Sequence, residues 1–271
     1  MDIKRITSTL LGFPLVVIIL TLGNKYIVDI FLALIAMLGM QEYFNAISKD
    51  AKPVRWIGYV ACTFIGLIHI VPTYFPQLPT NEILILGIPT IMLILFAQVI
   101  FTNMKTTYKD IAYTFFGIAY VIGFIVFIAL LRGLDNGRIL VWYAIIAAWG
   151  TDTCAYLIGK RFGKHKLSKI SPKKSVEGAI AGIVGSTIIA IAYTVIMNNL
   201  YNLEYSYLFV TIVTMILSVI GQIGDFAASS IKRYVDVKDY SNLIPGHGGM
   251  LDRIDSLMFL APFAYILFSI I

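Results

Sequence analysis

Charge is scarce in this chain. Of its 271 residues only 13% are Asp, Glu, Lys or Arg, whereas 59% are hydrophobic and the mean hydropathy is +0.85. A soluble domain carries about 25% charged residues, so a soluble fold of this size would lack the polar residues to cover its surface. The scarcity excludes an ordinary soluble protein, and with so little total charge the net charge of +6 does not make a nucleic-acid-binding surface.

Cysteine is equally sparse. Cys62 and Cys154 lie far apart, each in an apolar run, which excludes a disulfide framework and a zinc knuckle and leaves two buried, inert thiols. A basic pair followed by apolar residues opens the chain in the manner of a signal peptide, but no small-residue cleavage site follows. We interpret this opening as the first retained membrane span.

Long apolar segments are what the sequence has in abundance. A membrane helix needs roughly 20 mostly apolar residues. Segments of this kind lie at 6–23, 26–47, 56–75, 83–101, 111–131, 139–159, 176–197, 205–228 and 251–271. We therefore expect an all-α polytopic membrane protein with about nine transmembrane helices, in which residues 1–271 form a single membrane domain.

Basic residues are distributed unevenly between alternate loops. One set of loops holds 18 of the 21 Lys and Arg residues, and the other set holds Lys25, Arg132 and Arg138. The positive-inside rule then predicts a cytoplasmic N-terminus and an external C-terminus. Residues 1–138 read as mainly scaffold spans, whereas 139–271 carry two long cytoplasmic loops and most intramembrane acids, as expected of a catalytic half.

Acids within membrane spans are costly and therefore candidate functional residues. Asp152, Asp225, Asp252 and Asp255 all fall in the predicted cytoplasmic half of the bilayer. The spacing of Asp252 and Asp255 places both on one helix face. Carboxylates that converge in a water-accessible cavity suit Mg²⁺; the alternative is acids paired with Lys or Arg at the interface.

Two cytoplasmic loops carry further signals. In the segment Pro245–Arg253, Gly246, Gly248 and Gly249 precede a helix, so backbone amides and the helix N-terminus favour a phosphate. The loop between 159 and 178 holds seven basic residues, including Lys173 and Lys174. It predicts a clamp for a polyphosphate or a lipid phosphate, or alternatively a basic loop that touches anionic headgroups.

A longer, irregular pattern runs through the same region. It comprises Asp152 with Ala155-Tyr156 and Gly159, Ser171-Pro172-Lys173-Lys174 with Glu177-Gly178, Gly224-Asp225, Ser229-Ser230-Ile231-Lys232-Arg233, Lys238-Asp239, Leu243 through Gly249, and Asp252-Arg253-Ile254-Asp255. This pattern resembles the signature of phosphatidate cytidylyltransferase, also called CDP-diglyceride synthase, over roughly residues 147–256. Ala228 departs from it, because many bacterial members have an acid there, and Cys154 and Ser175 are local variants. Glu42-Tyr43 resembles a short family pattern in an early span.

The resemblance implies the Mg²⁺-dependent reaction of CTP with phosphatidate to give CDP-diacylglycerol and pyrophosphate, a step of phospholipid biosynthesis at the bacterial inner membrane, with the site facing the cytoplasm. The second pKa of a phosphomonoester is near 6, so the lipid phosphate needs no strong protein base. The sequence shows no evident Ser–His–Asp triad. Metal ions and basic residues would instead neutralise the repulsion between the two phosphate groups, and three acids leave room for a second cation.

The residue roles follow as hypotheses. Asp225, Asp252 and Asp255 hold metal, and Asp152 assists. The remaining catalytic and substrate-binding candidates are Lys232, Arg233 and Arg253 for phosphate, Lys173 and Lys174 for the triphosphate, His247 with Gly246, Gly248 and Gly249 for the phosphate cradle, and Ser229, Lys238 and Asp239 for substrate.

Other functions stay open at this point. A related CTP-dependent lipid-phosphate transferase or a polyprenol kinase would use the same metal and phosphate groups. An ion-coupled transporter would place its acids near the midplane and show repeat symmetry, which this sequence does not. The size and type of the chain also favour a homodimer. His69, far from these acids, is expected to be structural.

Overall fold

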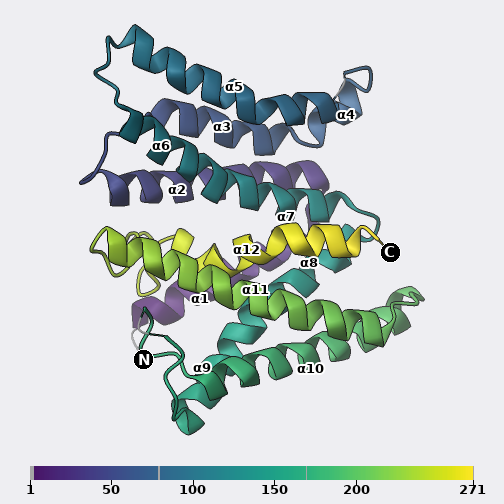
Figure 1. Ribbon diagram of the computed structural model, residues 1–271. Helices are drawn as coiled ribbons and strands as arrows, with labels where there is room; N and C mark the ends of the chain where they lie inside the picture. The colour runs from purple at the N-terminus through teal and green to yellow at the C-terminus, as the bar shows by residue number, and fades with distance from the viewer. Residues whose placement is uncertain (1–2, 79, 169, 271) are drawn as a thin grey trace. The chain divides into compact units, whose positions relative to one another are not determined.

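The computed structural model describes residues 3–78, 80–168 and 170–270, without the side chains of 3–9, 11 and 80–84 (Figure 1). Lys169 and the side chains of Lys4 and Arg5, which belong to the counted basic residues, therefore lie outside the description. Within the described residues all regular structure is helical, apart from two isolated β-bridges. The all-α prediction is confirmed.

Every predicted apolar segment contains helix. The described helices are α1 (Ile3–Leu22), α2 (Lys25–Ile47), α3 (Arg55–Leu67), α4 (Ile70–Tyr74), α5 (Thr80–Phe101), α6 (Tyr108–Gly117), α7 (Gly123–Gly133), α8 (Gly137–Ile145), α9 (Thr151–Phe162), α10 (Val176–Tyr201), α11 (Tyr207–Tyr234) and α12 (Leu251–Phe268). The third segment is interrupted between α3 and α4. The fifth and sixth are continuous but contain π-helical turns, η1 (Ile118–Ile122) and η2 (Ile146–Gly150).

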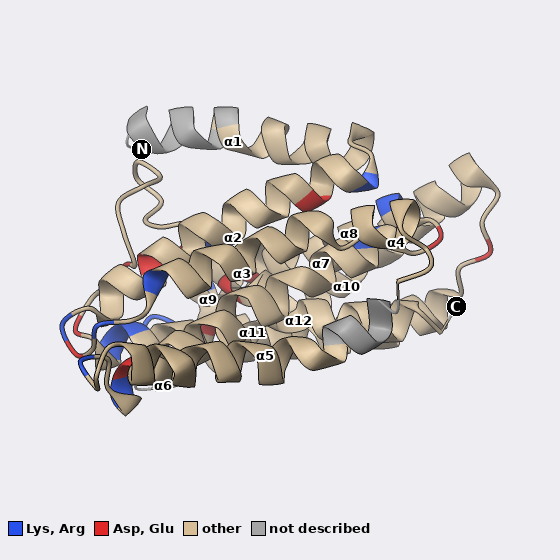
Figure 2. Cartoon of the chain, turned by 90° about the horizontal axis from the view of Figure 1, so that it is seen from above, with Lys and Arg blue, Asp and Glu red and all other residues tan. Residues whose placement is uncertain are grey.

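Four of the described helical stretches are long and apolar enough to cross a membrane. They are Lys25–Ile47, Tyr108–Gly133, Val176–Tyr201 and Tyr207–Tyr234. Large apolar side chains such as Leu93 and Leu208 are about seven-tenths exposed, which a bilayer explains and water does not. Lys and Arg lie toward the ends of the helices rather than in their middles (Figure 2). The chain is an integral membrane protein.

The helices group into two compact units. The first consists of residues 1–133 and 235–253, and the second of 134–234 and 254–271. The segment 235–253 returns to the first unit, and helix α12 contributes its first turn to that unit and the rest to the second.

In the first unit, α2 packs against α3, α6 and α7. A capping box begins α6, with Thr107 and Asp110 binding each other's backbone amides. Asp110 Oδ1 also accepts a hydrogen bond of 2.6 Å from Lys52 N. The α2–α3 and α5–α6 connections are thereby fixed together. Elsewhere in this unit Arg132 Nη2 donates to Gly23 O at 2.8 Å, which joins the end of α7 to the α1–α2 link.

In the second unit, close helix packing depends on small residues. A Cβ at Gly178 would lie 2.8 Å from Ala155 O, and one at Gly182 would lie 2.8 Å from Thr151 O. This G-x-x-x-G spacing lets α10 approach the backbone of α9. Gly224 does the same for α11, because a Cβ there would lie 3.0 Å from Asp255 O of α12. These glycines therefore bring α10 close to α9 and α11 close to α12.

Candidate active site

Lys174 lies among acids in the second unit. Its Nζ forms an ion pair with Asp225 Oδ2 of α11, and the two side chains are 31% and 21% exposed. The charges of Asp152 on α9 and Asp255 on α12 also act on this ammonium. The structure thus brings one predicted phosphate-binding lysine together with three predicted acids.

The pKa of Lys174 is lowered from its ordinary value. Burial is the main cause, and the nearby positive charge of Lys232 acts in the same direction, whereas Asp152 and Asp255 raise the pKa. The lowering means that Asp152 and Asp255 do not compensate the loss of water fully. A further anion, such as a phosphate, would favour the charged lysine.

Two of these acids are tied to the same residue of α12. Ser256 Oγ donates to Asp152 Oδ2 at 3.4 Å, and Ser256 N donates to Asp255 Oδ1 at 2.8 Å. Asp255 is buried, whereas Asp152 is exposed. Asp152 sits in the first turn of α9 directly after η2, a π-turn of the sort that often occurs at functional sites.

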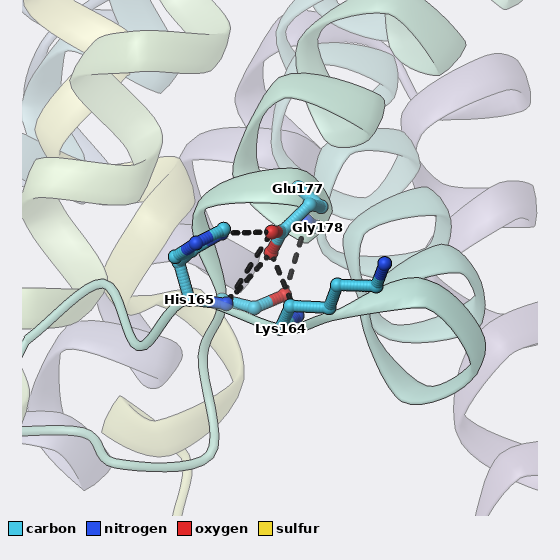
Figure 3. A network of polar contacts seen from close by, with 5 residues as sticks. Lys164, His165, Glu177 and Gly178 are labelled. Carbon is cyan, nitrogen blue, oxygen red and sulfur yellow. Dashed lines mark hydrogen bonds and ion pairs between the residues drawn. The ribbon is translucent and has the colours of Figure 1, made fainter.

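The loop between α9 and α10 is held in shape by Glu177 (Figure 3). Its carboxylate accepts hydrogen bonds from Lys164 N at 3.1 Å, from His165 N at 3.3 Å and from His165 Nδ1 at 2.6 Å. Two backbone bonds, Leu167 N to Lys174 O and Val176 N to His165 O, close the loop as a short hairpin. These contacts lead the backbone to Lys174, whose side chain reaches Asp225.

The glycine-rich segment belongs to the first unit. His247 N donates to Ile244 O, and Pro245 and Gly246 occupy the centre of that turn, with φ of +77° at Gly246. A proline followed by a residue with positive φ is what a type II turn requires. Asp252 Oδ2 then accepts from Gly249 N and Tyr240 N, each at 2.9 Å, and binds the segment back onto the start of α12.

Glu42 is the residue that sequence reasoning missed. It lies in α2, is 4% exposed, and accepts hydrogen bonds from Met250 N, Leu251 N and Ser241 Oγ. The available signals were its position as an acid within an apolar span and the short Glu42-Tyr43 pattern. The amides at the start of α12 that were expected to bind phosphate thus bind Glu42 in this structure.

The other predicted residues lie at the ends of helices or in the connections between them. Ser229, Lys232 and Arg233 occupy the last turns of α11, and Arg253 is exposed in the first turn of α12. Lys173, Lys238 and Asp239 are exposed, and His247 is half-buried. Ala228 is fully buried. His69 accords with its expected structural role, because its Nδ1 pairs with buried Asp29 at 2.8 Å.

Metal-binding geometry is not assembled by protein side chains alone. In the part of the chain that the structure describes, no three His, Cys, Asp or Glu side chains form a group that could hold an ion. Asp225 and Asp255 belong to the second unit, and Asp252 lies one helical turn earlier on α12, in the first unit. The donors that surround Lys174 are carboxylate oxygens, which suit Mg²⁺, an ion usually bound by one or two carboxylates together with substrate phosphates.

Comparison with known proteins identifies relatives along the whole chain. The model of the Cytidylyltransferase family matches residues 3–271. A Bacillus subtilis (strain 168) protein named phosphatidate cytidylyltransferase is 37% identical over 193 residues, 68% of this chain and 70% of the relative. A protein of the same name from Staphylococcus haemolyticus (strain JCSC1435) is 40% identical over 176 residues, 64% of this chain and 65% of the relative. Another from Staphylococcus aureus (strain COL) is 33% identical over 269 residues, 98% of both chains.

Proposed function

This chain belongs to the cytidylyltransferase family, and from that membership we propose that it converts CTP and phosphatidate to CDP-diacylglycerol and pyrophosphate. A phosphate oxygen of phosphatidate attacks the α-phosphorus of CTP and forms a new P–O bond. The bond between the α-phosphorus and the oxygen that bridges to the β-phosphorus breaks, and its electron pair leaves with pyrophosphate. No proton needs to be removed from the attacking phosphate, because it is already largely ionised at neutral pH.

The residues around Lys174 carry this proposal. Lys174 lies beside three acids, on a loop that also holds Lys173, so charges of both signs meet within one unit. In our account Lys173 and Lys174 bind the triphosphate of CTP. When the nucleotide enters, Lys174 leaves its carboxylate partner and binds phosphate oxygens, because the triphosphate carries more negative charge than one carboxylate.

Asp225, Asp252 and Asp255 hold Mg²⁺ in this proposal, with Asp152 assisting. Bound Mg²⁺ would neutralise phosphate charge and favour departure of pyrophosphate. Asp225 offers its carboxylate once Lys174 has moved to the triphosphate. Asp252 contributes less, because its Oδ2 already accepts two backbone amides.

Phosphatidate would meet the basic residues at the end of α11 and the start of α12. Lys232 and Arg233 lie in the last turn of α11, and Arg253 is exposed in the first turn of α12. Their guanidinium and ammonium groups suit a phosphate dianion. Ser229, Lys238 and Asp239 would complete the substrate contacts, and His247 with its neighbouring glycines would line the approach.

We place this site at the cytoplasmic face of the bacterial inner membrane, in a chain with nine spans and a cytoplasmic N-terminus. Two contacts within the first unit support the alternation of sides: Lys52 N binds Asp110, and Arg132 binds Gly23 O. Each contact joins two loops that the positive-inside rule assigns to the same side. Labelling of single cysteines placed in these loops of intact vesicles tests the orientation, and mass measurement in detergent tests the expected homodimer.

The reaction is tested with purified protein in detergent micelles containing phosphatidate, Mg²⁺ and CTP labelled at either the α- or the γ-phosphate. Cytidylyl transfer places the α label in lipid and the γ label in pyrophosphate. A kinase would place the γ label in lipid instead, which would overturn the proposal in favour of the kinase alternative. Transfer of the α label to another lipid phosphate, but not to phosphatidate, would show that this other lipid is the acceptor.

A further inference from the structure

Three donors of one short segment converge on the carboxylate of Glu42. Oε1 accepts a hydrogen bond of 2.8 Å from Met250 N and one of 2.6 Å from Ser241 Oγ, and Oε2 accepts one of 2.8 Å from Leu251 N. All of these groups belong to the first unit. The acid reaches from α2, some 200 residues away in sequence, to the first turn of α12.

The surroundings of Glu42 leave little freedom. The residue is 4% exposed, and a Cβ at Gly249 would lie 2.6 Å from Oε2 and 2.8 Å from Oε1. Gly249 therefore has to lack a side chain for the carboxylate to reach the amides behind it. Its φ is not positive, so the need for glycine here is one of space and not of backbone conformation.

A buried carboxylate at a helix N-terminus is favourable for two reasons. It satisfies amides that have no partner within the helix, and it opposes the positive end of the helix dipole. Asp252 Oδ2 takes the next amide, that of Gly249, so two acids share the start of α12. This arrangement fixes the position and direction of the turn that carries Asp252 and Arg253, and Asp255 follows three residues later on the same helix.

We propose that Glu42 is a positioning residue for the reaction, which sets the start of α12 so that its acids and Arg253 meet metal and phosphate in the required geometry. The inference rests on the proposed function and assigns to α2 a part in it. In this role Glu42 acts through the start of α12 and not on the substrate itself. Losing a group that orients ligands in this manner costs roughly 10- to 100-fold in metal affinity or activity.

The first unit supplies a matched control. Asp110 is 5% exposed and, like Glu42, accepts three hydrogen bonds, from Lys52 N, Thr107 N and Thr107 Oγ1. It caps α6, and these hydrogen bonds are to Lys52 and Thr107 rather than to the glycine-rich segment. Asp110→Asn thus removes a buried anchoring charge from the same unit without disturbing α12.

The experiment compares wild type, Glu42→Gln, Gly249→Ala and Asp110→Asn in detergent, using labelled CTP and phosphatidate at a series of Mg²⁺ concentrations. In Glu42→Gln the amide NH₂ faces the N–H of Leu251, so this bond is lost. We expect a lower kcat and a Mg²⁺ requirement raised roughly 10-fold or more. Gly249→Ala should act alike, because its methyl group displaces the Glu42 carboxylate. Asp110→Asn should leave the Mg²⁺ requirement unchanged.

Amide hydrogen exchange of the peptide that covers 240–251 is measured on the same four proteins. Faster exchange in Glu42→Gln and Gly249→Ala, but not in Asp110→Asn, is the expected result. Unchanged exchange, or a Mg²⁺ requirement that stays at the wild-type value while only the active fraction falls, overturns the inference. If wild type transfers no label, the proposed function fails, and exchange still decides whether Glu42 holds the segment. If Glu42→Gln does not fold, Gly249→Ala provides the same decision.

Discussion

Three acids of the first unit and three of the second serve different purposes. In the first, Glu42, Asp110 and Asp252 accept hydrogen bonds from backbone amides. In the second, Asp225 pairs with the Lys174 ammonium, and Asp152 and Asp255 lie near enough to alter that lysine's pKa. Neither the residue type nor the position in an apolar segment distinguishes the acids of one unit from those of the other.

The difference lies in what the partner can do. A backbone amide at the start of a helix cannot leave without unwinding the helix, so an acid bound to it fixes structure. A lysine side chain on a loop can rotate toward a phosphate and release its carboxylate to a metal ion. Asp225 is therefore suited to change partners during the reaction, whereas Glu42 and Asp252 are suited to hold the start of α12.

Asp225→Asn should have the largest effect, because it removes the charge that pairs with Lys174 and is proposed to hold metal. We expect a loss of kcat on the order of 10²–10³, comparable to removal of a group that stabilises charge in a transition state. Initial rates with labelled CTP measure it, with Asp110→Asn as the control. Equal activity of the two variants would show that Asp225 is no more important for the reaction than Asp110.

Asp252→Asn should fall between these extremes. The amide oxygen can still accept from Gly249 N and Tyr240 N, so the segment stays attached while the charge is lost. We expect a loss of roughly 10- to 100-fold in rate at limiting Mg²⁺. Asp252→Ala, which also detaches the segment, should lose more. If Asn and Ala were equally impaired, the two amide contacts would contribute nothing to activity.

Lys174→Gln should separate metal binding from nucleotide binding. Without the ammonium, Asp225 loses the cation that pairs with it, so less Mg²⁺ is needed to reach half of the maximal rate. The KM for CTP should rise roughly 10- to 100-fold, since a hydrogen bond to a charged group contributes about 1.5–3 kcal/mol. Substrate titrations at several Mg²⁺ concentrations measure both. A higher Mg²⁺ requirement would show that Lys174 does not compete with the metal.

His165→Ala should have the smallest effect. His165 and Glu177 hold the loop that carries Lys174, but the histidine side chain is 78% exposed, and exposed pairs contribute little. We expect the KM for CTP to change by less than about threefold, because two backbone hydrogen bonds still close the loop. A change as large as that of Lys174→Gln would mean that the exposed pair controls the loop.

The helices were predictable because apolar length is a strong signal. The spans ending near Ile47 and Phe101 were placed within a few residues of α2 and α5. The interruption at Ile68–His69 and the turns η1 and η2 were not predicted, since a π-turn or a break costs no apolar character. The return of 235–253 to the first unit was also not visible, because it depends on Glu42 reaching the backbone of Met250 and Leu251.

Candidate site residues could be named from the sequence, but their arrangement could not. Irregular spacing of Asp, Lys and Gly identified Lys174, Asp225 and Asp255 as candidates, and the structure brings these three together. The spacing could not indicate that Lys174 pairs with Asp225, or that the amides of the glycine-rich segment bind acids. Such pairings depend on which helices approach closely, and this is set by Gly178, Gly182 and Gly224 at positions that only the packed structure defines.

The most direct test of the difference between the two units is a Mn²⁺ titration of the purified protein with CTP present, followed by the paramagnetic resonance signal of free Mn²⁺. Wild type and Asp110→Asn are compared with Asp225→Asn. Our account predicts that wild type and Asp110→Asn remove Mn²⁺ from solution equally and that Asp225→Asn binds it far more weakly. Equal binding by all three proteins would contradict it, because the carboxylate that pairs with Lys174 would then have no part in holding the metal.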